Sequence, residues 1–187
     1  MRERLPDIIV LRLQNPLGLP GYDLLVGRNK AGELWQLLSS LGGKPAGLDA
    51  YELLRVETGT PTYGKDIDDE RFVVEVNRPQ AISYTKGCYL GQEPIVMARD
   101  RGHVNRKLLG VQVSGEGPVL YGTKLVRDGA EAGQVTSSVM SPRFGPIALA
   151  YLRRGHDSPG TKLEVESAGR TAEVVGLPFA GSGAALS

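Results

Sequence analysis

The strongest constraint on the fold is a series of six short β-rich runs in the second half of the chain. The runs recur at roughly ten-residue spacing after Arg106 and are separated by Gly, Pro and Ser turns. They cover residues 108–113, 119–126, 134–139, 147–152, 162–166 and 171–175. Short strands at even spacing are typical of a small antiparallel barrel or sandwich. The 25 Gly and 12 Pro of the chain agree with many turns and argue against long helices.

The first half of the chain mixes strand and helix patterns. Strands are predicted at residues 7–13 and 22–26, on either side of a turn rich in Pro and Gly. Leucines at three- and four-residue spacing predict a helix over residues 29–41. A second helix is predicted from Asp49 to about residue 59, because Asp49 as N-cap and Glu52 three residues later would form a capping box. A short helical stretch is predicted over residues 91–99.

These patterns predict an α+β fold with two domains. The first is an α/β module over residues 1–106. The second is a small antiparallel C-terminal β-barrel over residues 107–180, and residues 181–187 are expected to form a disordered tail.

Charge and composition exclude several classes of protein. With 22 Lys and Arg against 21 Asp and Glu, the net charge of +1 argues against a dedicated nucleic-acid binder, so no direct DNA binding is expected. A single Cys and two His exclude a disulfide framework and a self-contained Cys/His zinc site, and no metal site is expected. The start of the sequence lacks an apolar signal segment and no run could span a bilayer, so we expect a cytoplasmic protein without a membrane partner.

Two acidic features have open interpretations. Residues 66–70, Asp-Ile-Asp-Asp-Glu, resemble the start of a calcium loop, but Arg71 and Asn77 stand where that loop needs Gly and Glu. A solvated acidic turn is therefore expected. Glu57 lies at the end of a predicted helix, where an unpaired carboxylate is unfavourable. It needs a partner such as Arg55 or a ligand rich in N–H groups, unless it is an ordinary surface residue.

The loop around Cys88 is the most informative stretch for chemistry. Gly87 leaves the thiol accessible, and Lys86 together with the following helix would favour the thiolate. The alternative is an inert, buried cysteine. The window of residues 86–107 has a surplus of three positive charges, which suits either an anionic ligand tail or RNA phosphate, or else a solvated linker.

The same loop carries a family resemblance. The signature Lys86-Gly87-Cys88-Tyr89-Leu90-Gly91-Gln92-Glu93 resembles K-G-C-Y-x-G-Q-E of the YgfZ family of folate-binding, iron–sulfur-related proteins. That family is related to the glycine-cleavage aminomethyltransferase, GcvT. Supporting motifs occur in order along the chain: R-V-E-T-G at 55–59, Y-G-K-D-I at 63–67, G-Q-V-T-S at 133–137, Ser-Pro at 141–142 and Leu-Pro-Phe at 177–179.

The resemblance implies a tetrahydrofolate-type ligand in a cavity between a GcvT-like α+β module and the barrel. It implies that Glu57 holds the pterin ring and that Arg99 and Tyr63 also bind the cofactor. It assigns the chemistry to Cys88 and Lys86. The N-terminal segment that carries the catalytic Asp of aminomethyltransferases is expected to be missing, and their folate-binding Arg falls on or near Lys86.

Three functions are consistent with these residues. The leading interpretation is a tetrahydrofolate-binding protein that supports assembly or repair of iron–sulfur enzymes, including some that modify tRNA, through transient contacts with those clients. The second is a folate-dependent aminomethyltransferase. The third is a truncated, non-catalytic binding module.

Overall fold

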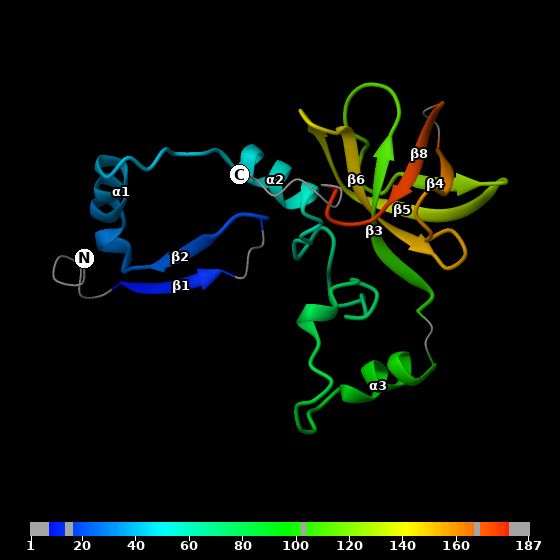
Figure 1. The fold of residues 1–187 in the computed structure, drawn as a ribbon, viewed down its shortest axis with the longest axis horizontal. Helices are drawn as coiled ribbons and strands as arrows, with labels where there is room; N and C mark the ends of the chain where they lie inside the picture. The colour runs from blue at the N-terminus through cyan, green and yellow to red at the C-terminus, as the bar shows by residue number, and fades with distance from the viewer. Residues whose placement is uncertain (1–7, 14–16, 102–103, 167–168, 180–187) are drawn as a thin grey trace. The chain divides into compact units, whose positions relative to one another are not determined.

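The structure is a computed structural model in which the chain forms two compact units, residues 1–55 and 56–187, and each is considered by itself (Figure 1). It describes residues 8–13, 17–101, 104–166 and 169–179. The tail expected to be disordered, residues 181–187, lies outside this range. No helix in the described part of the chain is long and apolar enough to cross a membrane.

The first unit contains a hairpin followed by helices. Strands β1 (Ile9–Leu13) and β2 (Gly21–Leu25) pair antiparallel, as the sequence predicted. A short 3-10 turn, η1 (Arg28–Lys30), leads into α1 (Ala31–Ser40), which confirms the predicted leucine-rich helix.

Helix α2 (Leu48–Glu57) leads from the first unit into the second and corrects one prediction. It begins at Leu48, so Asp49 lies inside the first turn and is not the N-cap. The Glu52 carboxylate instead pairs with Arg55 at 2.6 Å, one turn further along the helix. The capping box was therefore wrong, because Asp49 already lies inside the helix, one residue after its start.

The second unit ends in a closed barrel of six antiparallel strands, which decides between the barrel and the sandwich (Figure 1). Before the barrel come η2 (Pro79–Ala81) and α3 (Gln92–Arg101). The predicted run at 119–126 shortens to a four-residue strand. The six strands are β3 (Arg106–Val113), β4 (Lys124–Arg127), β5 (Ala130–Ser141), β6 (Gly145–Arg153), β7 (Lys162–Val165) and β8 (Arg170–Val175).

The barrel closes in the order β3-β6-β5-β4-β7-β8, with β3 pairing to both β6 and β8. Val111, Leu125 and Val135 belong to its fully buried interior. A second apolar cluster lies outside the barrel wall and includes Leu149 of β6 and Val56 at the end of α2. This second cluster holds the end of α2 against the barrel, which positions the neighbouring Glu57.

Strand β5 contains a bulge that matters for the site. Val135 pairs with Ala150 and Ser137 pairs with Leu149, so Thr136 is an extra residue with no partner of its own. Neighbouring side chains of a regular strand point to opposite faces. A bulge breaks this alternation, and here both Thr136 and Ser137 reach the outer side of the barrel.

The last described residues return to the end of α2. The amide of Phe179 donates to the carbonyl oxygen of Glu57 at 2.8 Å. Leu177 packs over Gly59, whose φ is +72° and whose missing Cβ would lie 2.7 Å from Leu177 Cδ1. Only glycine meets both demands at this position.

The domain boundary predicted near residue 106 differs from the division between Arg55 and Val56. Residues 56–105 go with the barrel because buried acids of this segment bind barrel residues. The first barrel strand does begin at Arg106. Whether the chain is cut most readily near residues 102–106 stays a prediction for limited proteolysis.

Candidate functional site

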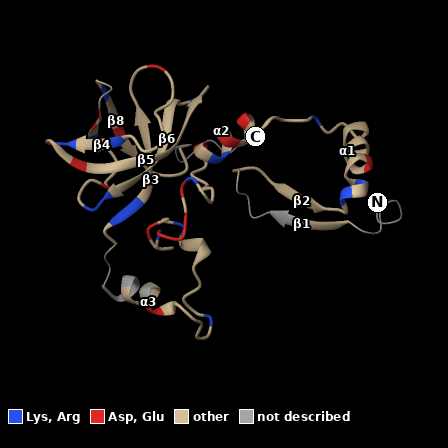
Figure 2. Cartoon of the chain, turned by 180° about the vertical axis from the view of Figure 1, so that it is seen from behind, with Lys and Arg blue, Asp and Glu red and all other residues tan. Residues whose placement is uncertain are grey.

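Three buried acids lie at nine-residue intervals in the segment between α2 and η2. Glu57, Asp66 and Glu75 are 2%, 1% and 6% exposed. A buried carboxylate is costly unless charged or polar donors satisfy it. Each of the three binds a partner on the barrel, and Figure 2 shows acidic residues in this segment and basic residues at the start of β3.

Glu57 binds the end of β5 and the turn after it. The Ser141 hydroxyl donates to Glu57 Oε1 at 2.6 Å, and the Arg143 guanidinium forms a short ion pair with Oε2. Arg143 is 42% exposed, whereas Glu57 is almost fully covered. The alternative of an ordinary surface glutamate is therefore wrong, and the partner that the carboxylate needs is an arginine, Arg143 rather than Arg55.

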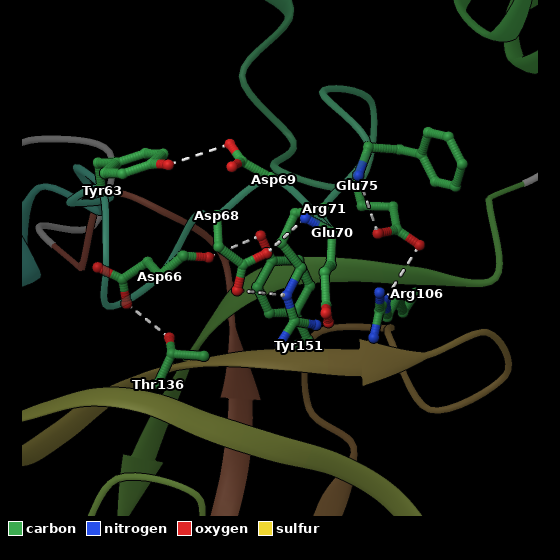
Figure 3. Close-up of polar contacts among 11 residues, drawn as sticks. Tyr63, Asp66, Asp68, Asp69, Glu70, Arg71, Glu75, Arg106, Thr136 and Tyr151 are labelled. Carbon is green, nitrogen blue, oxygen red and sulfur yellow. Dashed lines mark hydrogen bonds and ion pairs between the residues drawn. The ribbon is translucent and has the colours of Figure 1, made fainter.

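Asp66 binds the β5 bulge (Figure 3). Its Oδ1 atom accepts hydrogen bonds from Thr136 at 2.5 Å and from Ser137 at 2.7 Å, and its Oδ2 atom accepts one from the Thr62 amide at 2.9 Å. This acid is structural, since protein donors surround it.

A solvated acidic turn was predicted for residues 66–70. The prediction is wrong for Asp66, which is buried, and is confirmed for Asp68, Asp69 and Glu70, which are exposed. Within the described residues, no group of three or more His, Cys, Asp or Glu side chains could hold a metal ion.

Glu75 and Tyr151 form the third contact (Figure 3). Glu75 Oε1 pairs with Arg106 Nε at 3.1 Å. The guanidinium carbons of Arg71 and Arg106 lie 4.4 and 5.6 Å from the centroid of the Tyr151 ring. The Tyr151 hydroxyl donates to the backbone oxygen of Asp66 at 2.9 Å, and burial raises the pKa of Tyr151 to about 12.

Comparison with known proteins gives a family for the barrel. Residues 106–180 match the family described as the glycine cleavage T-protein C-terminal barrel domain. The barrel is thus similar to the C-terminal barrel domain of the glycine cleavage T-protein.

Two relatives are similar to this chain over a longer stretch than the barrel alone. The chain is 35% identical over 166 residues to an aminomethyltransferase of Halothermothrix orenii, covering 85% of this chain and 46% of that protein. It is 36% identical over 166 residues to an aminomethyltransferase of a Nostoc species, covering 87% and 44%. The chain therefore spans about half the length of the curated relatives that it matches.

A solved structure agrees. The glycine cleavage system aminomethyltransferase T of Bartonella henselae superposes with a TM-score of 0.83 at 25% identity, covering 92% of this chain and 50% of that one. Together these similarities support a place for the chain in the glycine cleavage T-protein superfamily.

The barrel is also where several sequence motifs meet. The Asp66 of Y-G-K-D-I binds Thr136 and Ser137 of G-Q-V-T-S. The Glu57 of R-V-E-T-G binds the serine of the Ser141-Pro142 motif. These motifs lie far apart in the sequence, and the structure shows that they contact one another in pairs.

The described residues of the signature loop take no part in these three hydrogen bonds. Cys88 is exposed, which confirms an accessible thiol and makes the alternative of an inert buried cysteine wrong. Lys86 Nζ lies 4.0 Å from the centroid of the Tyr89 ring, so its ammonium group stacks within the loop. Gly91 has a φ of +81°, and Gln92 and Glu93 begin α3.

Of the other expected ligand residues, only the side chain of Tyr63 is described, and it contacts Asp69 rather than Glu57. Tyr63 is 68% exposed, and its hydroxyl donates to Asp69 at 3.0 Å. The side chain of Arg99 lies outside the described residues. In the basic window, Arg106 pairs with Glu75, and Lys107 pairs with Asp157 at 3.6 Å.

Sequence reasoning missed two functional candidates. Arg143 was not singled out, although it directly follows the Ser-Pro motif that contains Ser141. Tyr151 was read only as part of a strand, and nothing in its local pattern marks the two arginines that stack on it.

Proposed function

We propose that this chain binds a tetrahydrofolate-type ligand through Glu57, as part of a folate-dependent aminomethyltransferase-like protein. The similarity to proteins named aminomethyltransferase supports this function better than it supports a YgfZ assignment. The observation that carries the proposal is the buried Glu57 carboxylate, bound by one hydroxyl and one guanidinium.

The Arg143 contact indicates how a pterin would bind. A guanidinium presents planar N–H donors to a carboxylate, and the amino and ring N–H groups of a pterin present a similar pair. An ionised carboxylate has about four lone-pair sites, so Ser141 can remain bound while the pterin takes the place of Arg143. Arg143 is partly exposed and can swing into solvent, whereas Ser141 is buried in the wall.

Calorimetric titration with tetrahydrofolate tests this function. Glu57→Gln should weaken binding by about tenfold or more, because it removes a charged hydrogen-bond acceptor. Glu116→Gln, which changes an exposed acid elsewhere on the barrel unit, is the matched control. Wild-type protein that gives no heat with millimolar tetrahydrofolate would contradict the proposal for this chain.

Arg143→Ala separates ligand binding from stability. If the pterin displaces Arg143, this variant should bind tetrahydrofolate at least as tightly as wild type while being less stable without ligand. Weaker binding by Arg143→Ala, with normal binding by the control, would mean that the guanidinium contacts the ligand and is not displaced.

The exposed thiol favours a second candidate function. Cys88 lies in the K-G-C-Y-x-G-Q-E signature, and support of iron–sulfur enzymes by a YgfZ-type protein would use an accessible thiol. One thiol cannot hold a cluster alone, since such sites normally use four ligands. Cys88→Ser should then abolish support of an iron–sulfur tRNA-modifying enzyme in cells and leave tetrahydrofolate affinity unchanged. Full complementation by this variant would exclude a role for the thiol.

A further inference from the structure

A pocket of about 620 Å³ lies on the barrel unit and is distinct from the Glu57 site. It is formed by the segment around Arg71, by the start of β3, by the start of β5 and by the end of β6. The charged residues that line it are Arg71, Glu75, Arg106, Glu131, Arg153 and Arg154. Neither Glu57 nor its partners Ser141 and Arg143 belong to the lining.

The lining carries more positive charge than its own acids neutralise. Arg106 pairs with Glu75 at 3.1 Å, and Arg153 pairs with Glu131 at 2.6 Å. These pairs account for both glutamates.

Arg71 and Arg154 remain as two further positive charges of the lining. Arg71 approaches only Asp68 among the described acids, at 3.8 Å, and Arg154 forms no ion pair within the described part of the chain. Arg154, and Arg71 beyond its long contact with Asp68, are therefore left to act on a ligand.

The Tyr151 ring contacts two of the arginines. Arg71 and Arg106 both stack on this ring, at 4.4 and 5.6 Å from its centroid (Figure 3). Stacking uses the flat face of a guanidinium and leaves its in-plane N–H donors for other partners. Tyr151 itself is 3% exposed and anchored through its hydroxyl to the Asp66 backbone, so the platform is rigid.

The lining holds four arginines against two glutamates, and an oxyanion bound among them would balance the remaining positive charge. Phe72 also lines the pocket and is 58% exposed, which offers an apolar surface beside the charges. We propose that this pocket binds a dianionic oxyanion group, either a phosphate monoester or a pair of carboxylates. The arginines supply the charge and Tyr151 fixes their orientation.

Titration with two simple anions tests the proposal. Inorganic phosphate and glutarate are added separately to the full chain at constant ionic strength, and binding is followed by calorimetry and by the melting temperature. Saturable binding of phosphate alone identifies a phosphate group, and saturable binding of glutarate identifies a dicarboxylate. Either result supports the pocket. If neither anion raises the melting temperature more than chloride at equal ionic strength, the proposal is wrong.

Variants locate the binding. Arg154→Gln changes an exposed, unpaired arginine and should fold normally while weakening binding about tenfold or more. Arg71→Gln should weaken it similarly. Arg127→Gln, which changes an arginine of β4 outside the pocket, should have no effect. Equal losses in all three variants would indicate non-specific attraction and overturn the proposal. Glu57→Gln should leave anion binding intact, so failure here and failure of the folate proposal are distinguishable.

Discussion

The hydroxyl of Ser141 donates a 2.6 Å hydrogen bond to the buried Oε1 atom of Glu57. The direction of this bond is fixed by the chain around it. Backbone amides of Arg143 and Phe144 both donate to the same hydroxyl oxygen at 3.0 Å, so the Ser141 proton is left for the carboxylate. One serine thereby orders the turn after β5 and the acid at the end of α2.

Ser141→Ala should lower the free energy of unfolding by about 1–3 kcal/mol, because it leaves a buried carboxylate oxygen and two amides without their partner. Urea denaturation measures this loss. Ser158→Ala, at an exposed loop position, is the control and should stay within about 0.5 kcal/mol of wild type. Equal stability of the two variants would mean that water replaces the hydroxyl at no cost.

Asp66→Asn should also destabilise the chain by about 1–3 kcal/mol. The new amide group would place a donor where Oδ2 now accepts from the Thr62 amide, or else would turn a donor toward the two hydroxyls of the bulge. Glu70→Gln changes an exposed acid of the same turn and should be nearly neutral. A comparable loss in both variants would point to the net charge of the turn rather than to the bulge contact.

Two glycines separate backbone strain from steric overlap. Gly59 and Gly64 have φ values of +72° and +81°, but a Cβ at Gly59 would lie 2.7 Å from Leu177, whereas a Cβ at Gly64 meets no atom within 4 Å. Gly64→Ala should cost about 1–2 kcal/mol from the left-handed backbone alone. Gly59→Ala should cost about 1–3 kcal/mol more, from overpacking. Equal losses in thermal unfolding would show that Leu177 moves freely.

Tyr151 should make the chain sensitive to alkali. Burial raises its pKa from 10.0 to about 12, so the unfolded chain ionises first as the pH rises. The stability that the neutral Tyr151 hydroxyl contributes is therefore fully present below about pH 10. Between about pH 10 and 12 the free energy of unfolding falls by roughly 2–3 kcal/mol. Unfolding of wild type and Tyr151→Phe at pH 8 and pH 11 measures it.

The phenylalanine variant should lose less stability than wild type between the two pH values, although it starts lower because the bond to the Asp66 backbone is gone. Tyr121→Phe, at a position 68% exposed, should follow the wild-type curve. A parallel fall of all three proteins would assign the alkaline loss to other groups.

Much of the architecture could be predicted from local patterns. Turn residues at even spacing predicted six strands, and leucine periodicity predicted α1. Closure into a barrel could not be predicted, because it depends on β3 pairing with β8 across more than fifty residues. The Asp49 N-cap was wrong because the helix begins one residue earlier, at Leu48, and a local capping pattern does not fix a helix start to a single residue.

Residues of the candidate site could be predicted only where they belong to a recognisable sequence motif. Glu57 and Cys88 were singled out from the sequence, but burial of Glu57 and its pairing with Arg143 depend on a contact between residues 86 positions apart. Asp66 was misread because its neighbours are acidic and exposed. Asp66 is buried because the β5 bulge turns both Thr136 and Ser137 toward it. A regular strand with alternating side chains would present only one of these two hydroxyls, so the sequence pattern does not predict the contact.

The bulge at Thr136 also determines where β5 can lose a residue. Deleting Thr136 would leave Val135 and Ser137 as ordinary neighbours on opposite faces, so Ser141 would still point at Glu57 and one of the two hydroxyls on Asp66 would remain. Deleting Ser138 instead would turn Val139 and Ser141 toward the barrel interior, because side chains alternate along a strand. Two deletions of similar size and two positions apart should therefore have opposite outcomes, the first tolerated and the second disruptive to the Glu57 contact.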